Sequence, residues 1–393
     1  MTAPLRRDQH TFGLELTDAI TRLGSRPDDH DHDFEPCRPD LDQVARLART
    51  AQRGSLDFFI ADDTLGGLGP QSGRRRSGTG PLRFATRLAP ASGPMAVVPR
   101  VRAAAIEPEK LLDGLVAVEL ASAGPLAWQL DLPSGGPNGL RVANLLTAVV
   151  RDAYEDGTPR TQIGSLARAR RARGIREGRA AGLRGHDARP GVNGRSVAPV
   201  APLLVVSAVS SEEIIFAAQR ADIVRLVVKD MADSLLLRRE IHAVARKAGR
   251  MGREPKVIVD LPTCVGEDVG SAEARREIVE AMTAAPLGRG VVWAGTAAGL
   301  AEMVNAWITA GACDGFTFLP TSLPSDLIAI VDTVMPLLQT YGVARKAQPQ
   351  VSMSKLLSRT EPTAEPRVIG RAGVPRTLPT ARPIRKAVPT RVR

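Results

Sequence analysis

Apolar residues recur at helical spacing near the end of the chain. Five of them follow at i, i+3, i+4, i+7 and i+8, the stripe of an amphipathic helix: Leu300, Met303, Val304, Trp307 and Ile308. Thr296 stands where an N-cap residue is expected, and Gly311 stands where a glycine commonly ends a helix. The pattern therefore predicts one helix between these two residues.

A short apolar run and a second stripe follow this helix. Residues 314–319, DGFTFL, have the length and apolar content of a strand buried under helices. Pro324 is suited to the start of the next helix, whose apolar positions continue to Leu338. Alternating helices and strands of this kind predict a parallel sheet in an α/β fold.

The same alternation extends over most of the chain. Strands are predicted at residues 11–16, 56–60, 94–98, 202–208, 223–228 and 257–261. Helices are predicted at residues 40–52, 108–120, 212–220, 231–248 and 271–283. A chain of 393 residues can hold one large barrel of such units or two smaller domains.

The formal net charge of +11 is concentrated in two segments. Residues 168–195 carry nine Arg against two acidic residues, and residues 343–393 carry twelve Lys and Arg against two Glu. The remainder of the chain is acidic overall. The segment from 343 lacks apolar periodicity, so we expect a solvated, disordered tail. Binding of nucleic acid or an acidic partner is the alternative, but the tail has no aromatic residue for base stacking.

Cysteine and histidine usage gives no metal or disulfide prediction. Cys37, Cys264 and Cys313 are far apart and form no CxxC pair, which favours a reducing cytoplasm. The HDHD sequence around His30 is placed in an N-terminal loop, and we predict no metal there. The N-terminus lacks a signal-peptide core, and no run has the 18 apolar residues of a membrane span. We expect a protein that is neither exported nor bound to a membrane.

Several residues in the closing segment recur in one known family. They are the pair Gly295 and Thr296, Trp307, the triplet at residues 314–316, and the run VMPLLQ at residues 334–339. In this order and spacing they resemble the end of the bacterial-luciferase-like flavin-dependent monooxygenases. The nearest branch is that of the nitrilotriacetate and dibenzothiophene-sulfone monooxygenases.

Residues 47–63, 107–128, 202–226 and 248–259 also resemble segments of this family. The resemblance implies a single (β/α)8 TIM barrel of luciferase-like type over residues 1–342. It also implies that the Arg/Gly-rich segment at about 164–199 is an insertion loop near the mouth of the barrel. The basic tail, residues 343–393, would lie outside the barrel domain.

Ser210 and Ser211 follow an apolar strand and precede a helix, where hydroxyl and free N–H groups favour an anion. The resemblance implies that both bind the phosphate of FMN; the alternative is that one serine is only the helix N-cap. Asp62 ends the predicted strand LDFFI, and the resemblance implies a position near the flavin ring. A loop-capping role is its alternative. Trp128 would lie at the entrance, or would be a packing residue.

The chain also departs from the family pattern. Glu212 and Glu213 stand where the family usually has a glycine, and a carboxylate beside a phosphate opposes binding. Gly124 is followed by Pro125 where a glycine-arginine pair is usual. The His and Arg-Tyr elements of the family have no counterpart. A degenerate barrel that binds flavin weakly or not at all, with a binding or regulatory role, is therefore the alternative.

The activity that the resemblance implies is oxygen insertion. Reduced FMN, supplied by a separate flavin reductase, would provide the chemistry by which one atom of O2 enters a small organic substrate. No catalytic residue is predicted, since the cofactor carries the reaction. The resemblance also implies a homo-oligomer and a cytoplasmic enzyme. Nucleic acid is expected as a partner only if the basic tail recruits it.

Overall fold

The computed structural model describes residues 10–16, 40–62, 79–132, 137–155, 201–283 and 286–345. All of them belong to one unit, Met1–Ser358. The predicted insertion at 164–199 and the tail beyond residue 345 lie outside the described residues, so the expectations for both segments remain predictions. The first residues of the predicted tail are an exception: Val343 and Ala344 are buried against the core, so the ordered chain continues past the expected boundary at residue 342.

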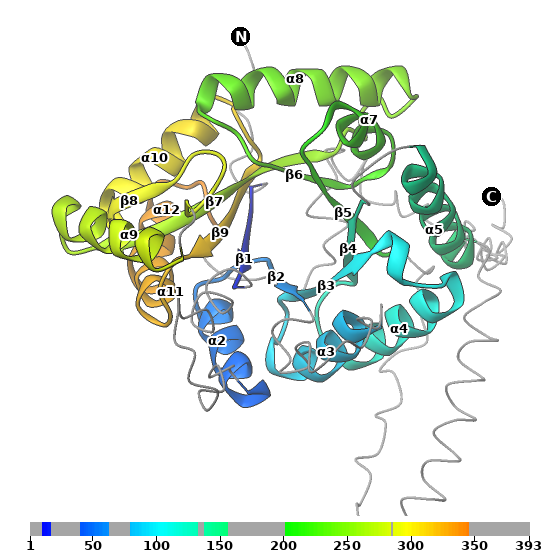
Figure 1. Ribbon diagram of the computed structural model, residues 1–393, viewed down its shortest axis with the longest axis horizontal. Helices are drawn as coiled ribbons and strands as arrows, with labels where there is room; N and C mark the ends of the chain where they lie inside the picture. The colour runs from blue at the N-terminus through cyan, green and yellow to red at the C-terminus, as the bar shows by residue number, and fades with distance from the viewer. Residues whose placement is uncertain are drawn as a thin grey trace, which may run out of the picture. The chain divides into compact units, whose positions relative to one another are not determined.

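Eight parallel strands form a closed barrel (Figure 1). Each of β1 to β6 pairs with the next strand, β6 pairs with β7, and β9 joins β7 to β1. The ring consists of β1 (Thr11–Glu15), β2 (Phe58–Ala61), β3 (Ala96–Arg102), β4 (Ala127–Asp131), β5 (Leu203–Ala208), β6 (Ile223–Leu226), β7 (Lys256–Gly266) and β9 (Gly315–Pro320). Strand β8 (Trp293–Thr296) extends the sheet outside the ring by pairing with the last residues of β7.

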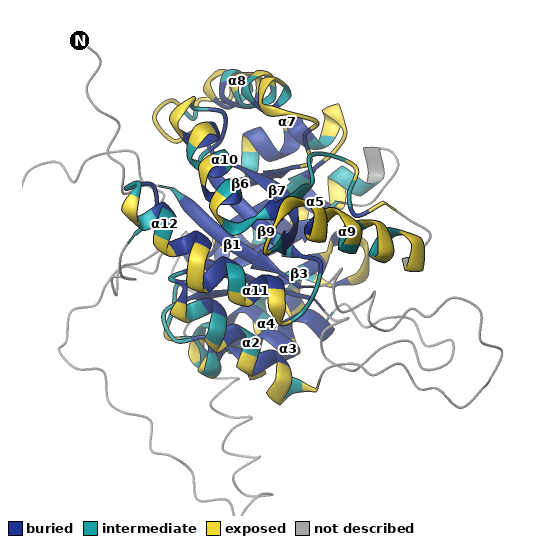
Figure 2. Cartoon of the chain, turned by 90° about the vertical axis from the view of Figure 1, so that its left-hand side faces the viewer, coloured by how far each residue is buried: buried dark blue, intermediate teal, exposed yellow. Residues whose placement is uncertain are grey.

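Helices surround the barrel and turn their exposed faces outward, whereas the strands are buried (Figure 2). They are α2 (Leu41–Arg53), α3 (Gly80–Leu88), α4 (Pro108–Ala121), α5 (Pro137–Glu155), α7 (Ser211–Arg220), α8 (Met231–Lys247), α9 (Val269–Thr283), α10 (Ala297–Thr309), α11 (Ser325–Ala329) and α12 (Met335–Thr340). A π-helical turn, Ile330–Val334, joins the last two, and short 3-10 turns occupy Ala89–Ala91 and Ala103–Ala105. Among the described helices none is long and apolar enough to cross a membrane.

The structure confirms the predicted closing segment. Thr296 caps α10 by accepting a hydrogen bond from the Gly299 backbone N–H at 3.2 Å. Gly311 ends the helix with φ at 71°, and β9 follows. The strand β4 and the helix α3 were not predicted. This omission matters, because β4 carries part of the candidate site.

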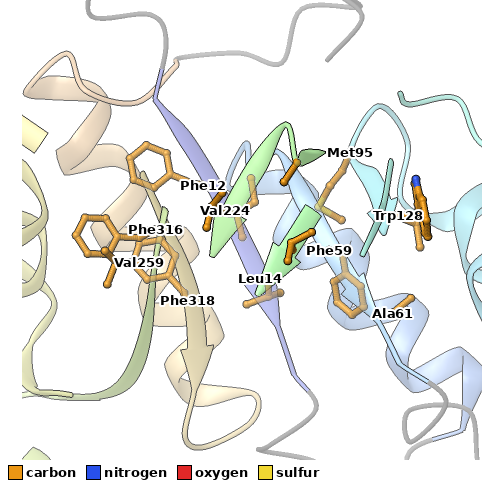
Figure 3. Packing of buried hydrophobic residues seen from close by; sticks show 14 of the residues in the cluster. Phe12, Leu14, Phe59, Ala61, Met95, Trp128, Val224, Val259, Phe316 and Phe318 are labelled. Atoms are coloured by element: carbon orange, nitrogen blue, oxygen red, sulfur yellow. The ribbon is translucent and has the colours of Figure 1, made fainter. Parts of the chain in front are cut away.

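Side chains that point out of the barrel pack beneath the helices (Figure 3). The rings of Phe12 on β1 and Phe318 on β9 stack with centroids 6.1 Å apart. The ring centroids of Trp307 on α10 and Phe316 on β9 are 5.9 Å apart. Trp128 of β4 belongs to this outer layer and is almost fully buried. The packing interpretation of Trp128 is therefore confirmed, and its expected place at the barrel entrance is wrong.

Two ion pairs tie the amino-terminal end of the barrel. Asp57, just before β2, accepts a hydrogen bond from the Phe12 backbone N–H at 2.8 Å and pairs with Arg345. Asp314, just before β9, binds Arg238 of α8 through two hydrogen bonds, at 2.8 and 3.3 Å. Both pairs lie at the opposite end of the strands from the ends where ligands bind in barrels of this type.

Candidate active site

The interior of the barrel has two layers of different chemistry. Alternation along each strand sends every second side chain inward. Near the amino-terminal ends these side chains are mainly apolar and form one buried cluster: Phe58, Ile60, Ala96, Val98, Ala127, Leu203, Val205, Ile223 and Ile258. One or two steps further along the strands, the inward residues are polar or charged: Glu15, Asp62, Arg100, Gln129, Asp131, Arg225, Asp260 and Thr317. We call this second set the polar layer.

Arg225 of β6 is the deepest cation of the polar layer, with 2% of its side chain exposed. Its Nε donates to Asp260 Oδ1 of β7 at 2.8 Å, and Nη1 donates to Gln129 Oε1 of β4 at 2.7 Å. Its Nη2 forms an ion pair with Glu15 of β1. A buried charge is tolerated only when it is paired and hydrogen-bonded, and Arg225 meets both conditions from three strands.

The protonation states of this buried pair follow from its surroundings. Burial alone would lower the pKa of Arg225, but Asp260 and Glu15 raise it above its ordinary value. Burial raises the pKa of Asp260, and the neighbouring Arg225 offsets only part of that rise. The guanidinium therefore remains charged at every working pH, whereas the carboxyl of Asp260 takes up a proton more readily than an exposed aspartate does.

Arg100 of β3 is the outer cation of the polar layer. Its Nε donates to Asp131 Oδ2 of β4 at 2.7 Å, and its Nη1 donates to Glu15 Oε1 at 2.9 Å. The same Nη1 lies 3.7 Å from Asp62 Oδ2. The side chain of Arg100 is 30% exposed, so it borders the open end of the barrel. Glu15 thus joins the two arginines into one network.

Asp62 lies directly after β2, at the carboxyl-terminal end of the barrel. Its side chain is buried and faces Arg100. This is the location that the resemblance implies for an aspartate near a flavin ring. Its assignment to flavin binding stays a prediction.

Ser210 is the N-cap residue of α7. Its Oγ accepts a hydrogen bond from the Glu213 backbone N–H at 3.3 Å. The carboxylate of Glu213 turns back and accepts from the backbone N–H groups of Val209 at 2.8 Å and of Ser210 at 3.0 Å. This reciprocal capping box confirms the N-cap interpretation of Ser210 and leaves the phosphate prediction untested.

Other donors remain at the start of α7. Ser211 and Glu212 are exposed, and within the described part of the chain neither their backbone N–H groups nor the Ser211 hydroxyl has an acceptor. These groups lie where the helix dipole favours negative charge. The carboxylates of Glu212 and Glu213 oppose an anion at the same place.

The predicted site residues fall on two parts of the ring. Asp62 belongs to the polar layer, while Ser210 and Ser211 follow β5, which is separated from β2 by β3 and β4. Sequence analysis missed most of the polar layer: Glu15, Arg100, Gln129, Asp131, Arg225 and Asp260. A usable signal was present in β2 and β3, where inward apolar residues lead at every second position to Asp62 and to Arg100.

Comparison with known proteins agrees with this architecture. No family model matches the sequence. A segment of 55 residues is 42% identical to N-acetyl-S-(2-succino)cysteine monooxygenase of Bacillus subtilis (strain 168), but the match covers 14% of this chain and 12% of that protein. The evidence from sequence is therefore local.

Solved structures match over much greater lengths. EDTA monooxygenase (EmoA) from Chelativorans sp. BNC1 has a TM-score of 0.63 at 17% identity, with 89% of this chain and 98% of that chain covered. Riboflavin lyase (RcaE), solved with modified FMN and riboflavin, has a TM-score of 0.62 at 16% identity, with 89% of this chain and 96% of that chain covered. Long-chain alkane monooxygenase (LadA) has a TM-score of 0.61 at 14% identity, with 91% of this chain and 96% of that chain covered. The fold is thus the luciferase-like (β/α)8 barrel.

Proposed function

We propose that this protein is a flavin-dependent monooxygenase. It takes reduced FMN from a separate flavin reductase and uses O2 to insert one oxygen atom into a small organic substrate, while the second oxygen atom leaves as water and the flavin leaves oxidised. The observation that carries the proposal is the polar layer at the carboxyl end of a luciferase-like barrel. Ligands of such barrels bind at that end.

The donors and acceptors of the mouth are suited to a flavin. Asp62 supplies a carboxylate for the N–H groups of the ring, and Arg100 supplies N–H donors for its carbonyl oxygens. The Ser211 hydroxyl and the backbone N–H groups of Ser211 and Glu212 at the start of α7 are suited to the phosphate. The residues present therefore fit FMN, although the carboxylates of Glu212 and Glu213 weaken the binding of its phosphate.

The sequence motifs favour one branch of these enzymes, that of the nitrilotriacetate and dibenzothiophene-sulfone monooxygenases. A homo-oligomer and a cytoplasmic location belong to the same proposal. The RcaE structure, which contains modified FMN and riboflavin, supports a flavin as the cofactor.

A second candidate is a degenerate barrel with a binding or regulatory role. The observation in its favour is Glu213, whose carboxylate already accepts from two backbone N–H groups at the start of α7. An incoming phosphate would meet this negative charge. If the repulsion dominates, the barrel binds flavin weakly or not at all.

An anaerobic titration of the full chain with reduced FMN separates the two candidates. The monooxygenase proposal expects saturable binding in the micromolar to sub-millimolar range. If no saturable binding occurs there, the degenerate barrel is favoured.

Two serine variants then locate the phosphate. Ser211→Ala removes a hydroxyl that takes no part in the capping box, so it should weaken FMN binding without lowering the stability of the protein. Ser210→Ala should weaken FMN binding and also cost about 1 kcal/mol of stability, because it removes the N-cap. Unchanged FMN affinity in both variants would reject the phosphate site at this turn.

A further inference from the structure

The two arginines of the polar layer differ in how many of their donors are used. A guanidinium has one N–H at Nε and two at each terminal nitrogen. In Arg225 all three nitrogens have partners on other strands. In Arg100, Nε and Nη1 have partners, whereas Nη2 has no acceptor among the residues that the structure describes.

The position of Arg100 makes these unused donors accessible. Its side chain is 30% exposed, compared with 2% for Arg225, and it lies at the carboxyl end of β3. Asp131 holds Nε from one side, and Glu15 holds Nη1 from another. A donor fixed on two sides needs little reorganisation when a ligand arrives. Arg225 therefore only connects strands inside the barrel, whereas Arg100 connects strands and also keeps the donors of Nη2 for a ligand.

The charges around Arg100 restrict what its open edge can bind. Three carboxylates lie on the sides of the guanidinium, those of Glu15, Asp62 and Asp131. Together they exceed the charge of Arg100, so a phosphate dianion would be repelled from this part of the mouth. A neutral acceptor, such as a ring carbonyl oxygen, gains the directional hydrogen bond without that repulsion.

We propose that Arg100 binds the carbonyl-bearing edge of the flavin ring through Nη2 and thereby fixes the orientation of the ring beside Asp62. This inference rests on the proposed function, because it requires that a flavin binds at the mouth. It assigns the ring edge to β3 and leaves the phosphate to the turn before α7. Arg100 is thus a cofactor-binding residue, and Glu15 and Asp131 are positioning residues that act through it.

The test is a binding comparison of FMN and riboflavin, which share the ring and differ in the phosphate. Arg100→Gln should weaken both flavins by the same factor, about tenfold, as expected for loss of a hydrogen bond from a charged group. Arg100→Lys should also weaken both, because one ammonium group cannot serve Glu15, Asp131 and a ring oxygen at once. The lysine variant keeps a positive charge beside the three carboxylates and so guards against loss of folding.

The control is Arg238→Gln, which breaks the ion pair with Asp314 at the opposite end of the barrel. It should leave the affinity for both flavins unchanged. A further probe requires no variant: FMN with sulfur in place of a ring carbonyl oxygen should bind the unmodified protein more weakly at one of the two carbonyl positions, since sulfur is the weaker acceptor.

The outcomes separate this inference from the proposed function. If the unmodified protein binds neither FMN nor riboflavin, the proposed function fails. If it binds both and Arg100→Gln binds them equally well, or loses affinity for FMN alone, the ring-edge assignment is overturned while the proposed function stands. An equal loss in Arg238→Gln would also overturn it, because the effect would then be structural.

Discussion

The Arg225 guanidinium of β6 donates to the Asp260 carboxylate of β7 at 2.8 Å inside the barrel, with both side chains almost completely buried. Neighbouring parallel strands place the two residues side by side, since Arg225 pairs in register with Ile258, two residues before Asp260. The ion pair therefore forms only where β6 lies beside β7, which is the pairing that closes the ring of strands.

Replacement of Arg225 should be among the most damaging single changes in this protein. Arg225→Gln leaves the Asp260 carboxylate buried without its cation and removes one of the two arginines that pair with Glu15, and loss of one partner of a buried pair costs about 3–5 kcal/mol. Chemical denaturation measures the change in free energy of unfolding. The control is Arg53→Gln, which breaks an exposed pair with Asp332 and should cost no more than about 1 kcal/mol. Similar losses in the two variants would contradict the prediction.

Gly315 should tolerate no side chain. Its φ is 153°, and a Cβ at this position would lie 1.8 Å from the backbone oxygen of Thr11 on the neighbouring strand. Gly315→Ala should therefore destabilise the protein by about 3 kcal/mol or more, since β1 and β9 must move apart.

Gly311 provides the matched control for Gly315. It also has a positive φ, 71°, but nothing lies within 4 Å of an added Cβ. Gly311→Ala should cost only about 1–2 kcal/mol, the penalty of the left-handed conformation. Thermal or chemical unfolding of both variants measures the difference, and equal losses would show that the contact with Thr11 is not decisive.

The Glu213 carboxylate should lower the affinity for the FMN phosphate at the start of α7. Glu213→Gln keeps the size of the side chain and removes its negative charge, so FMN affinity should rise by about three- to tenfold while riboflavin affinity stays constant. Asp233→Asn is the control, because Asp233 accepts from the Lys229 N–H at the start of α8 in the same way. The prediction fails if the ratio of the two affinities stays constant in Glu213→Gln.

Cys313 should be inert in the folded protein. Burial raises the pKa of its thiol to about 12, so little thiolate forms at pH 8. Since the ordinary pKa of 9.0 returns on unfolding, the unfolded state loses a proton first, and stability should fall as pH rises from about 9 toward 12. Alkylation at pH 8 followed by mass spectrometry should find Cys313 unlabelled until denaturant is added. Rapid native labelling would contradict the burial.

The sequence was sufficient for elements whose signals are local. The α10 helix carries its own N-cap in Thr296, its own apolar stripe and its own terminating Gly311, and the structure places all three as predicted. Asp62 was placed at the mouth because it directly follows a predicted strand and matches an aspartate of the family that the chain resembles, and its flavin-binding role stays a prediction. These inferences needed no knowledge of distant contacts.

Most of the polar layer could not be predicted in the same way. Arg225 lies within a short buried strand, and its partner Glu15 is 210 residues away in the sequence. A buried parallel strand is expected to be continuously apolar, so charged residues inside one weaken the signal for the strand itself. For β4, AWQLD, two of the three inward residues, Gln129 and Asp131, are polar, which explains why this strand was missed.

The linked charges also limit how this barrel can change through evolution or engineering. Glu15 contacts both arginines, and each arginine binds carboxylates from further strands, so a neutral substitution at one position leaves an opposite charge buried elsewhere. A new specificity at the mouth will therefore arise more readily from paired exchanges, or from residues outside the polar layer, than from single replacements within it.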